Sequence, residues 1–165
     1  MAPEDQEIYE KFTIIERKKS MIDAEFILNS LSQHFTFSSL MKDKYLLDHL
    51  IQEFKLCVVK EGEYLMQQHD NASCFFLLKE GQLSVEVDGM KQRNLNVGEG
   101  FGELSLLYSS PRSASIVALK KTLLWFIDRS TFRNVLSRII EKSFTENKKF
   151  IEANKFFTYL TPKQK

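Results

Sequence analysis

Residues 23–50 place apolar side chains at the three- and four-residue spacing of amphipathic helices. Residues 1–20 are mostly polar with scattered apolar positions, and we expect a frayed helix or disorder there. From Asp23 to Phe35 the apolar positions fit one helix. A second short helix is predicted over residues 37–50, with Ser39 or Asp43 as its N-terminal cap.

The pattern changes after Glu53, where short apolar runs alternate with turn residues such as Glu80-Gly81 and Asp88-Gly89. Asp88-Gly89 is a typical tight-hairpin signal. The runs that read as strands cover residues 56–59, 64–66, 74–78, 83–87, 90–95, 116–118 and 123–127. A set of about eight short, evenly spaced strands is typical of a barrel or jelly roll.

A long helix is predicted to begin at Asp128, with Ser130 as the competing cap. Its apolar stripe consists of Phe132, Val135, Leu136, Ile139 and Ile140. A break near Ser143 and a second helix beyond it are expected. The predicted fold class is therefore α+β, an eight-stranded antiparallel β-barrel or jelly roll flanked by N-terminal and C-terminal helices.

Composition narrows the function classes. The 165 residues are 43% hydrophobic, which is enough for a real core, and the net charge of +1 argues against nucleic acid as the main partner. No apolar run is long enough to span a bilayer. Cys57 and Cys74 lack the spacing of metal ligands, and without a signal peptide a reducing, cytoplasmic location is expected.

The most informative chemistry lies in residues 101–115, which read FGELSLLYSSPRSAS. Arg112 can pair with a phosphate in a fixed fork geometry, and backbone N–H groups of a short helix near Glu103 can add donors to the same anion. The small Ser113 and Ala114 let the backbone approach closely. Glu103 cannot bind a phosphate, but it can accept a hydrogen bond from a hydroxyl. The stretch therefore predicts a site for a small anion that carries a sugar hydroxyl.

This stretch closely resembles the phosphate-binding segment of cyclic nucleotide-binding domains, whose pattern is roughly F-G-E-[LI]-A-L-[LI]-x(3)-P-R-[AT]-A-[TS]. Ser105 stands for the usual alanine and Ser113 for alanine or threonine. The resemblance runs from about residue 25 to 155. The family's Q-G-[DE]-x-G turn reads QHDNA over residues 68–72, so we expect a changed turn in which Asn71 or His69 tolerates a left-handed conformation.

The resemblance implies a role for each matching residue. Arg112 would pair with the exocyclic phosphate oxygens, Glu103 would accept from the ribose 2′-hydroxyl, and Gly102 would give the chain room to turn. The backbone N–H groups that complete the anion site would belong to Leu104, Ser105, Ser113 and Ala114. No cofactor or metal is implied beyond cGMP or cAMP as an allosteric ligand.

Two positions favour guanine over adenine. Ser113 matches a position where cGMP-selective domains often carry threonine, and its hydroxyl can bond the 2-amino group. Arg93 matches a position where some such domains place an arginine that donates to guanine O6 and N7. The alternative for Arg93 is a solvated strand residue. The resemblance thus favours cGMP, with cAMP as the alternative ligand.

The sequence as a whole looks most like the first nucleotide-binding domain of a protist, apicomplexan-type cGMP-dependent protein kinase. That resemblance implies a polar segment over 1–22, a nucleotide-binding domain over 23–155, and a linker to a second domain from 156 to 165. The piece itself would not be an enzyme. It would relieve inhibition of a kinase domain, with adjacent nucleotide-binding and kinase domains as partners. The alternatives are a cAMP-dependent kinase regulatory subunit, a degenerate docking scaffold, or a channel or transcription-factor sensor.

The remaining motifs carry less chemistry. His34, His49 and His69 lack partners at ligand or triad spacing, and the glycines of residues 98–102 lack a Walker ending. The basic run over 17–20 is either a kinase substrate or pseudosubstrate segment or a solvated helix end. Five C-terminal apolar residues either cover a nucleotide base or form a docking face for another domain: Phe150, Ile151, Phe156, Phe157 and Tyr159.

Overall fold

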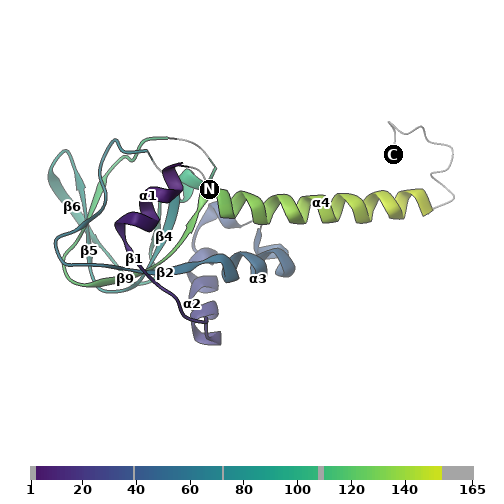
Figure 1. Cartoon of the computed structure of the whole chain (residues 1–165), viewed down its shortest axis with the longest axis horizontal. Coiled ribbons are helices and arrows are strands. Elements are labelled where there is room, and N and C mark those ends of the chain that lie inside the picture. The colour runs from purple at the N-terminus through teal and green to yellow at the C-terminus, as the bar shows by residue number, and fades with distance from the viewer. Residues whose placement is uncertain (1–2, 39, 72, 108–109, 154–165) are drawn as a thin grey trace.

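A computed structural model describes residues 3–38, 40–71, 73–107 and 110–153 of the chain, and Figure 1 gives its labels. Its helices and 3-10 turns are α1 (Pro3–Lys11), α2 (Met21–Ser32), η1 (Phe35–Phe37), η2 (Leu40–Lys42), α3 (Lys44–Glu53), η3 (Glu103–Leu106) and α4 (Arg129–Ala153). Its strands are β1 (Thr13–Ile15), β2 (Lys55–Val59), β3 (Tyr64–Met66), β4 (Cys74–Glu80), β5 (Leu83–Val87), β6 (Met90–Leu95), β7 (Gly100–Phe101), β8 (Ser115–Ala118) and β9 (Thr122–Asp128).

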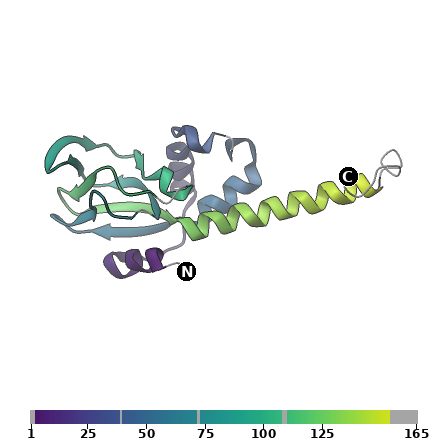
Figure 2. The same cartoon turned by 90° about the horizontal axis from the view of Figure 1, so that it is seen from above.

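The strands form two antiparallel sheets, one of five strands in the order β1-β2-β9-β4-β7 and one of four in the order β3-β8-β5-β6. Both sheets send side chains into a shared core; Phe76 and Phe126 come from the first sheet, and Leu83 and Ile116 from the second. The strands thus enclose an apolar interior at one end of the molecule, as Figure 2 shows from above. The predicted α+β jelly roll is confirmed.

The other face of the five-stranded sheet is covered by helices. Trp125 and Phe75 pack there against residues of α2, α3 and the first turns of α4, such as Leu31 and Leu50. Beyond this contact α4 projects away from the sheets as a single rod (Figures 1 and 2). Strands β4 and β9 are apolar on both faces because they lie between these two cores.

Two details differ from the sequence-based prediction, and one of its alternatives is decided. The polar N-terminal segment contains α1 and strand β1, and β1 and the two-residue β7 are strands that the pattern does not indicate. The expected break near Ser143 is wrong, because α4 runs without interruption from Arg129 to Ala153. Asp43 caps α3 through its carboxylate and the Leu46 N–H at 3.0 Å, whereas Ser39 lies outside the described residues.

Tight turns explain the left-handed residues. Asp88 and Gly89 have φ values of 53° and 77°, as the predicted hairpin between β5 and β6 requires. His69 takes a φ of 74°, so the histidine provides the left-handed conformation where the family pattern has a glycine. No described helix is long and apolar enough to cross a membrane.

Candidate functional site

The short helix η3 starts at a glycine that no other residue could replace easily. Gly102 has a φ of 82°, and a Cβ built there would overlap the Arg112 guanidinium and lie 2.7 Å from the Cys74 oxygen. After this turn Glu103 begins η3, and Leu106 is buried in the helix-side core and anchors it. The left-handed glycine therefore places η3 directly beside Arg112.

The backbone of Arg112 is fixed by the turn after β3. The Arg112 N–H donates to the Asp70 oxygen at 2.8 Å, and the His69 N–H donates to the Arg112 oxygen at 2.8 Å. Pro111 forms a further antiparallel bridge with Asn71. The changed turn thus holds the arginine between two backbone hydrogen bonds, which explains how the site persists without the family's glycines.

The side chain of Arg112 is buried, with 9% of its surface exposed. Its Nη2 donates to the Cys74 oxygen at 2.9 Å. The Ser105 hydroxyl lies 2.9 Å from the same oxygen and also contacts the Gly102 oxygen. One carbonyl at the start of β4 therefore positions both Arg112 and η3.

No carboxylate of the described residues forms an ion pair with Arg112. The pKa of Arg112 falls to about 10, chiefly because burial disfavours the charged form. Arg129 lowers it as well, and the charges of Asp70 and Glu103 partly offset these effects. Arg112 therefore stays protonated at neutral pH as a buried and incompletely compensated cation, which favours an anion at this place.

A pocket of about 290 Å³ opens in front of η3. Its lining unites six of the eight residues that the sequence singled out, namely Gly102, Glu103, Leu104, Ser105, Arg112 and Ser113, and also includes Ser110 and Pro111. Glu103 is half-buried and has no hydrogen bond or ion pair within the described residues, so its carboxylate is available to a ligand hydroxyl. The Ser105 N–H, in contrast, already donates to the Gly102 oxygen at 3.1 Å.

Two of the selected residues lie outside that lining. Ala114 is half-buried just before β8, and Arg93 is exposed on β6. The Arg93 guanidinium is paired with the Glu99 carboxylate, with Nη1 at 2.9 and 3.2 Å from its two oxygens. Arg93 would have to turn away from Glu99 to contact a ligand in this pocket.

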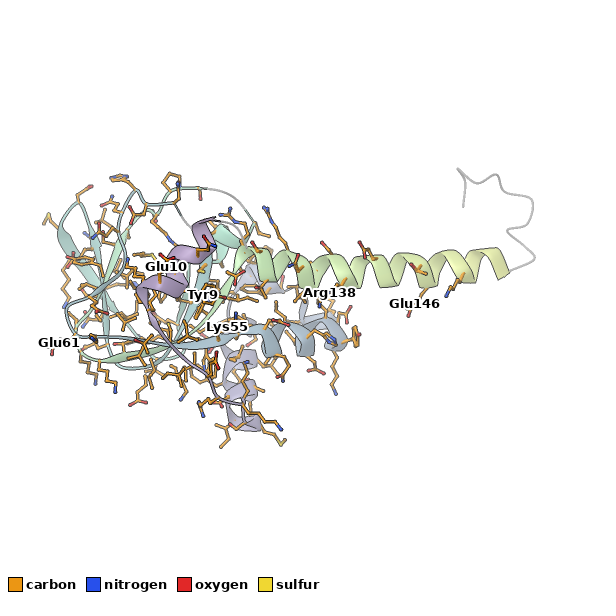
Figure 3. All side chains as sticks on the ribbon, viewed as in Figure 1. Tyr9, Glu10, Lys55, Glu61, Arg138 and Glu146 are labelled. Carbon is orange, nitrogen blue, oxygen red and sulfur yellow. The ribbon has the colours of Figure 1, made fainter. Side chains whose placement is uncertain are left out.

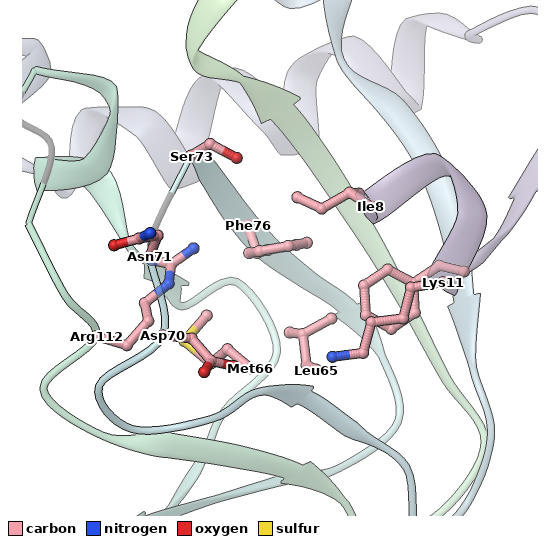
Figure 4. Close-up of a pocket in the computed structure, with 10 residues that line it drawn as sticks. Ile8, Lys11, Leu65, Met66, Asp70, Asn71, Ser73, Phe76 and Arg112 are labelled. Carbon is pink, nitrogen blue, oxygen red and sulfur yellow. The ribbon is translucent and has the colours of Figure 1, made fainter. Parts of the chain in front are cut away.

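A second pocket, of about 430 Å³, meets Arg112 from the other side. Figure 4 shows it between the arginine and the side chains of α1, with Phe76 at its centre and Lys11 opposite Arg112. Phe12, which directly follows α1, is buried in the interior of the jelly roll. Arg112 thus lines both cavities, and Ile8 and Lys11 of α1 line the second one.

Residues that the sequence reasoning missed connect the site to α4. The Arg129 Nε donates to the Ser105 oxygen at 2.6 Å, and the Arg129 N–H donates to the Ser73 oxygen at 2.7 Å. Asp128, which the sequence predicts as the start of this helix, caps α4 with its carboxylate 2.7 Å from the Thr131 nitrogen. Arg129 follows it directly, and nothing in the sequence pattern indicated its contact with η3.

Some expectations cannot be placed in the structure. Tyr108 and Ser109 of the binding stretch, and residues 156–165 with the predicted linker, lie outside the described residues. Phe150 and Ile151 belong to α4, but their side chains are not described. Within the described part, no group of three side chains could hold a metal ion.

Comparisons with known proteins agree with this geometry. A family model described as the cyclic nucleotide-binding domain matches residues 56–139. A cGMP-dependent protein kinase of Eimeria tenella is 32% identical over 150 residues, which are 90% of this chain and 15% of the kinase. One from Plasmodium berghei is 37% identical over 100 residues, 61% of this chain and 12% of that one. The chain therefore spans only a small part of these relatives.

A solved structure has the same fold. The regulatory domain of Toxoplasma gondii PKA, co-crystallised with cAMP, superposes with a TM-score of 0.61 at 28% sequence identity. The match covers 72% of this chain and 46% of that one.

Proposed function

Because the chain belongs to the cyclic nucleotide-binding domain family, we propose that it binds cGMP, in preference to cAMP, at η3 and Arg112 as a regulatory domain of a serine/threonine protein kinase. The observation that carries this proposal is that a buried arginine and a half-buried carboxylate line the same pocket, and that neither forms an ion pair among the described residues. Titration of the chain with the two nucleotides tests it.

The cyclic phosphate is the anion that Arg112 receives, through its exocyclic oxygens. Its guanidinium keeps one N–H group on the Cys74 oxygen, and the remaining donors can form a paired contact with two phosphate oxygens. Burial excludes competing water, so the contact is stronger than at an exposed arginine. The phosphate would also compensate the charge that burial disfavours.

Glu103 is assigned to the ribose. The ribose 2′-hydroxyl would donate to its carboxylate, and removal of that hydroxyl should weaken binding to the wild-type chain by about 1.5–3 kcal/mol. In Glu103→Gln the same ligand change should cost clearly less, because a double-mutant cycle isolates this contact. Titrations with cGMP and 2′-deoxy-cGMP on both proteins measure it.

The control for this cycle is Glu61→Gln, which removes an exposed carboxylate at the turn after β2 and should behave like the wild type (Figure 3). Equal losses in wild type and Glu103→Gln would show that the sugar binds elsewhere.

The preference for guanine is assigned to Ser113 and Arg93. Ser113 lines the pocket and can offer its hydroxyl to the 2-amino group, and Arg93 can offer donors to O6 and N7 if it turns from Glu99 toward the base. Each such contact contributes about 1–3 kcal/mol when well formed. The combined change Arg93→Ala and Ser113→Ala should therefore narrow the gap between cGMP and cAMP, mainly by weakening cGMP.

Competition titrations on wild type and the double variant measure this gap. A wild-type chain that binds cAMP as tightly as cGMP would contradict the assignment. It would then favour the second candidate, a cAMP-binding regulatory domain, for which the likeness to the Toxoplasma gondii PKA structure is the specific observation.

The output of binding is conformational. A phosphate on the remaining donors of Arg112 would shift the guanidinium that bonds to the Cys74 oxygen, and η3 shares that oxygen through Ser105. Arg129 ties η3 to the start of α4, so a shift of η3 would change the position of α4. A ligand drives such a change only by its preference for one state. In a longer cytoplasmic protein with adjacent nucleotide-binding and kinase domains, this movement would relieve inhibition of the kinase.

A further inference from the structure

A groove of about 580 Å³ shares no lining residue with the pocket at η3. It is lined by β1, the loop after β1, the end of α3 and the start of β2. Four basic side chains line it, those of Arg17, Lys18, Lys19 and Lys55. Two carboxylates, of Glu16 and Glu53, line it as well. We call this feature the basic groove; the basic run noted in the sequence forms one wall of it.

The floor of the basic groove contains an unsatisfied donor. Trp125 lines the groove, is 1% exposed, and its indole Nε1 has no hydrogen-bond partner among the residues that the structure describes. A buried donor without an acceptor is costly, so an acceptor supplied from outside would be favoured here. Arg17 and Lys19 stand over the same ring, with charged atoms 5.8 and 5.5 Å from its centre.

The cations are only partly satisfied by the chain itself. Arg17 pairs with Asp23 at 3.0 Å, and Lys19 donates to the Gln52 oxygen at 2.8 Å. Burial lowers the pKa of Lys19 more than the nearby Glu53 and Asp23 raise it. Lys18 is exposed and has no partner among the described residues.

The distribution of these groups distinguishes a polymer from a small anion. Lys55 lies beside Tyr9, with its Nζ 2.8 Å from the phenol oxygen (Figure 3). Arg17 and Lys19 lie over the Trp125 ring. The positive charges therefore occupy two places in the groove, one beside Tyr9 and one over Trp125. Aliphatic residues lie between them, Ile14 and Ile15 among others. This mixture fits a chain that presents carboxylates and apolar side chains in turn.

We infer that the basic groove is a docking surface for an acidic polypeptide segment whose carboxylates bind the Arg17–Lys19 run and the Trp125 indole N–H. The inference is independent of the nucleotide site, since none of its residues lines the pocket at η3. It also gives the basic run a role other than that of a kinase substrate, because the Ser20 hydroxyl already caps α2 through the Asp23 N–H at 3.1 Å.

The chain provides its own reporter, because Trp125 is its one tryptophan. A decapeptide of alternating glutamate and valine should change the tryptophan emission in a saturable way, and added salt should weaken the effect. Lys18→Glu should weaken binding about tenfold, since it reverses one charge of the groove. Lys91→Glu, the same change on exposed β6 of the other sheet, should leave binding unchanged.

Three outcomes would overturn the inference. A decapeptide of alternating lysine and valine could bind equally well, which would exclude charge recognition. Inorganic phosphate alone could produce the same emission change at the same concentration, which would indicate a small-anion site. The acidic peptide could bind by anisotropy without altering the emission, which would place it elsewhere. Lys18→Glu should bind cGMP like the wild type. Unchanged cGMP binding would show that a loss of peptide binding does not come from damage to the nucleotide site.

Discussion

Replacing Arg112 by alanine is expected to weaken cGMP binding by at least about 2 kcal/mol, roughly thirtyfold, because the phosphate loses a buried, charge-assisted partner. Arg112→Lys should also bind poorly, since a single ammonium cannot reproduce the two parallel contacts of a guanidinium. Isothermal titration calorimetry of the three proteins with cGMP measures both effects.

The stability of the free chain should respond differently. Arg112 has no carboxylate partner in the described part of the chain that the substitution would leave unpaired, and the Ser105 hydroxyl still reaches the Cys74 oxygen. The melting temperature of ligand-free Arg112→Ala should therefore stay close to that of the wild type. Arg138→Ala, an exposed position on α4, is the matched control for charge. Wild-type affinity in Arg112→Ala would refute the assignment of the site.

Gly102→Ala should damage both stability and binding. The left-handed φ of 82° is unfavourable for alanine, and the new methyl group would overlap the Arg112 guanidinium beside the Cys74 oxygen. We expect a loss of about 1–3 kcal/mol in the free energy of unfolding, from the strained backbone and the overlap together. Cyclic nucleotide affinity should fall as well, because Arg112 is displaced. Urea denaturation and a cGMP titration measure the two effects.

Gly62→Ala separates the backbone effect from the overlap. Gly62 has the same φ of 82°, but nothing lies within 4 Å of a Cβ built there. The Gly62→Ala variant should therefore lose about 1 kcal/mol at most in the free energy of unfolding and keep its nucleotide affinity. Equal effects of the two substitutions would show that the contact between Gly102 and Arg112 is unimportant.

The periodic parts of the fold were predictable, and the exceptions have physical reasons. The alternation of short runs and turn residues predicted β2 to β6, β8 and β9. The runs of β2, β4 and β9 are the most apolar because both faces of these strands lie against a core. Strand β1 was missed since it has three residues and owes its place to pairing with β2, which no local pattern reveals. The continuity of α4 past Ser143 was missed for a related reason, because polar residues are compatible with an exposed helix.

The candidate site was predictable as a set of side chains but not as a network. The spacing of Gly102, Glu103 and Arg112 was enough to place them around one pocket. The acceptor that positions Arg112 is the main-chain oxygen of Cys74, and the link to α4 is the main-chain oxygen of Ser105. Every residue has such an oxygen, so residue type carries no information about which one is used.

The central claim is that the pocket beside η3 binds a cyclic nucleotide, and a calorimetric titration of the wild-type chain with cGMP tests it most directly. We predict saturable binding of one cGMP per chain, weaker binding of cAMP, and much weaker binding of 5′-GMP, whose phosphate is not closed onto the ribose. Absence of saturable binding for both cyclic nucleotides by a folded chain would contradict the account.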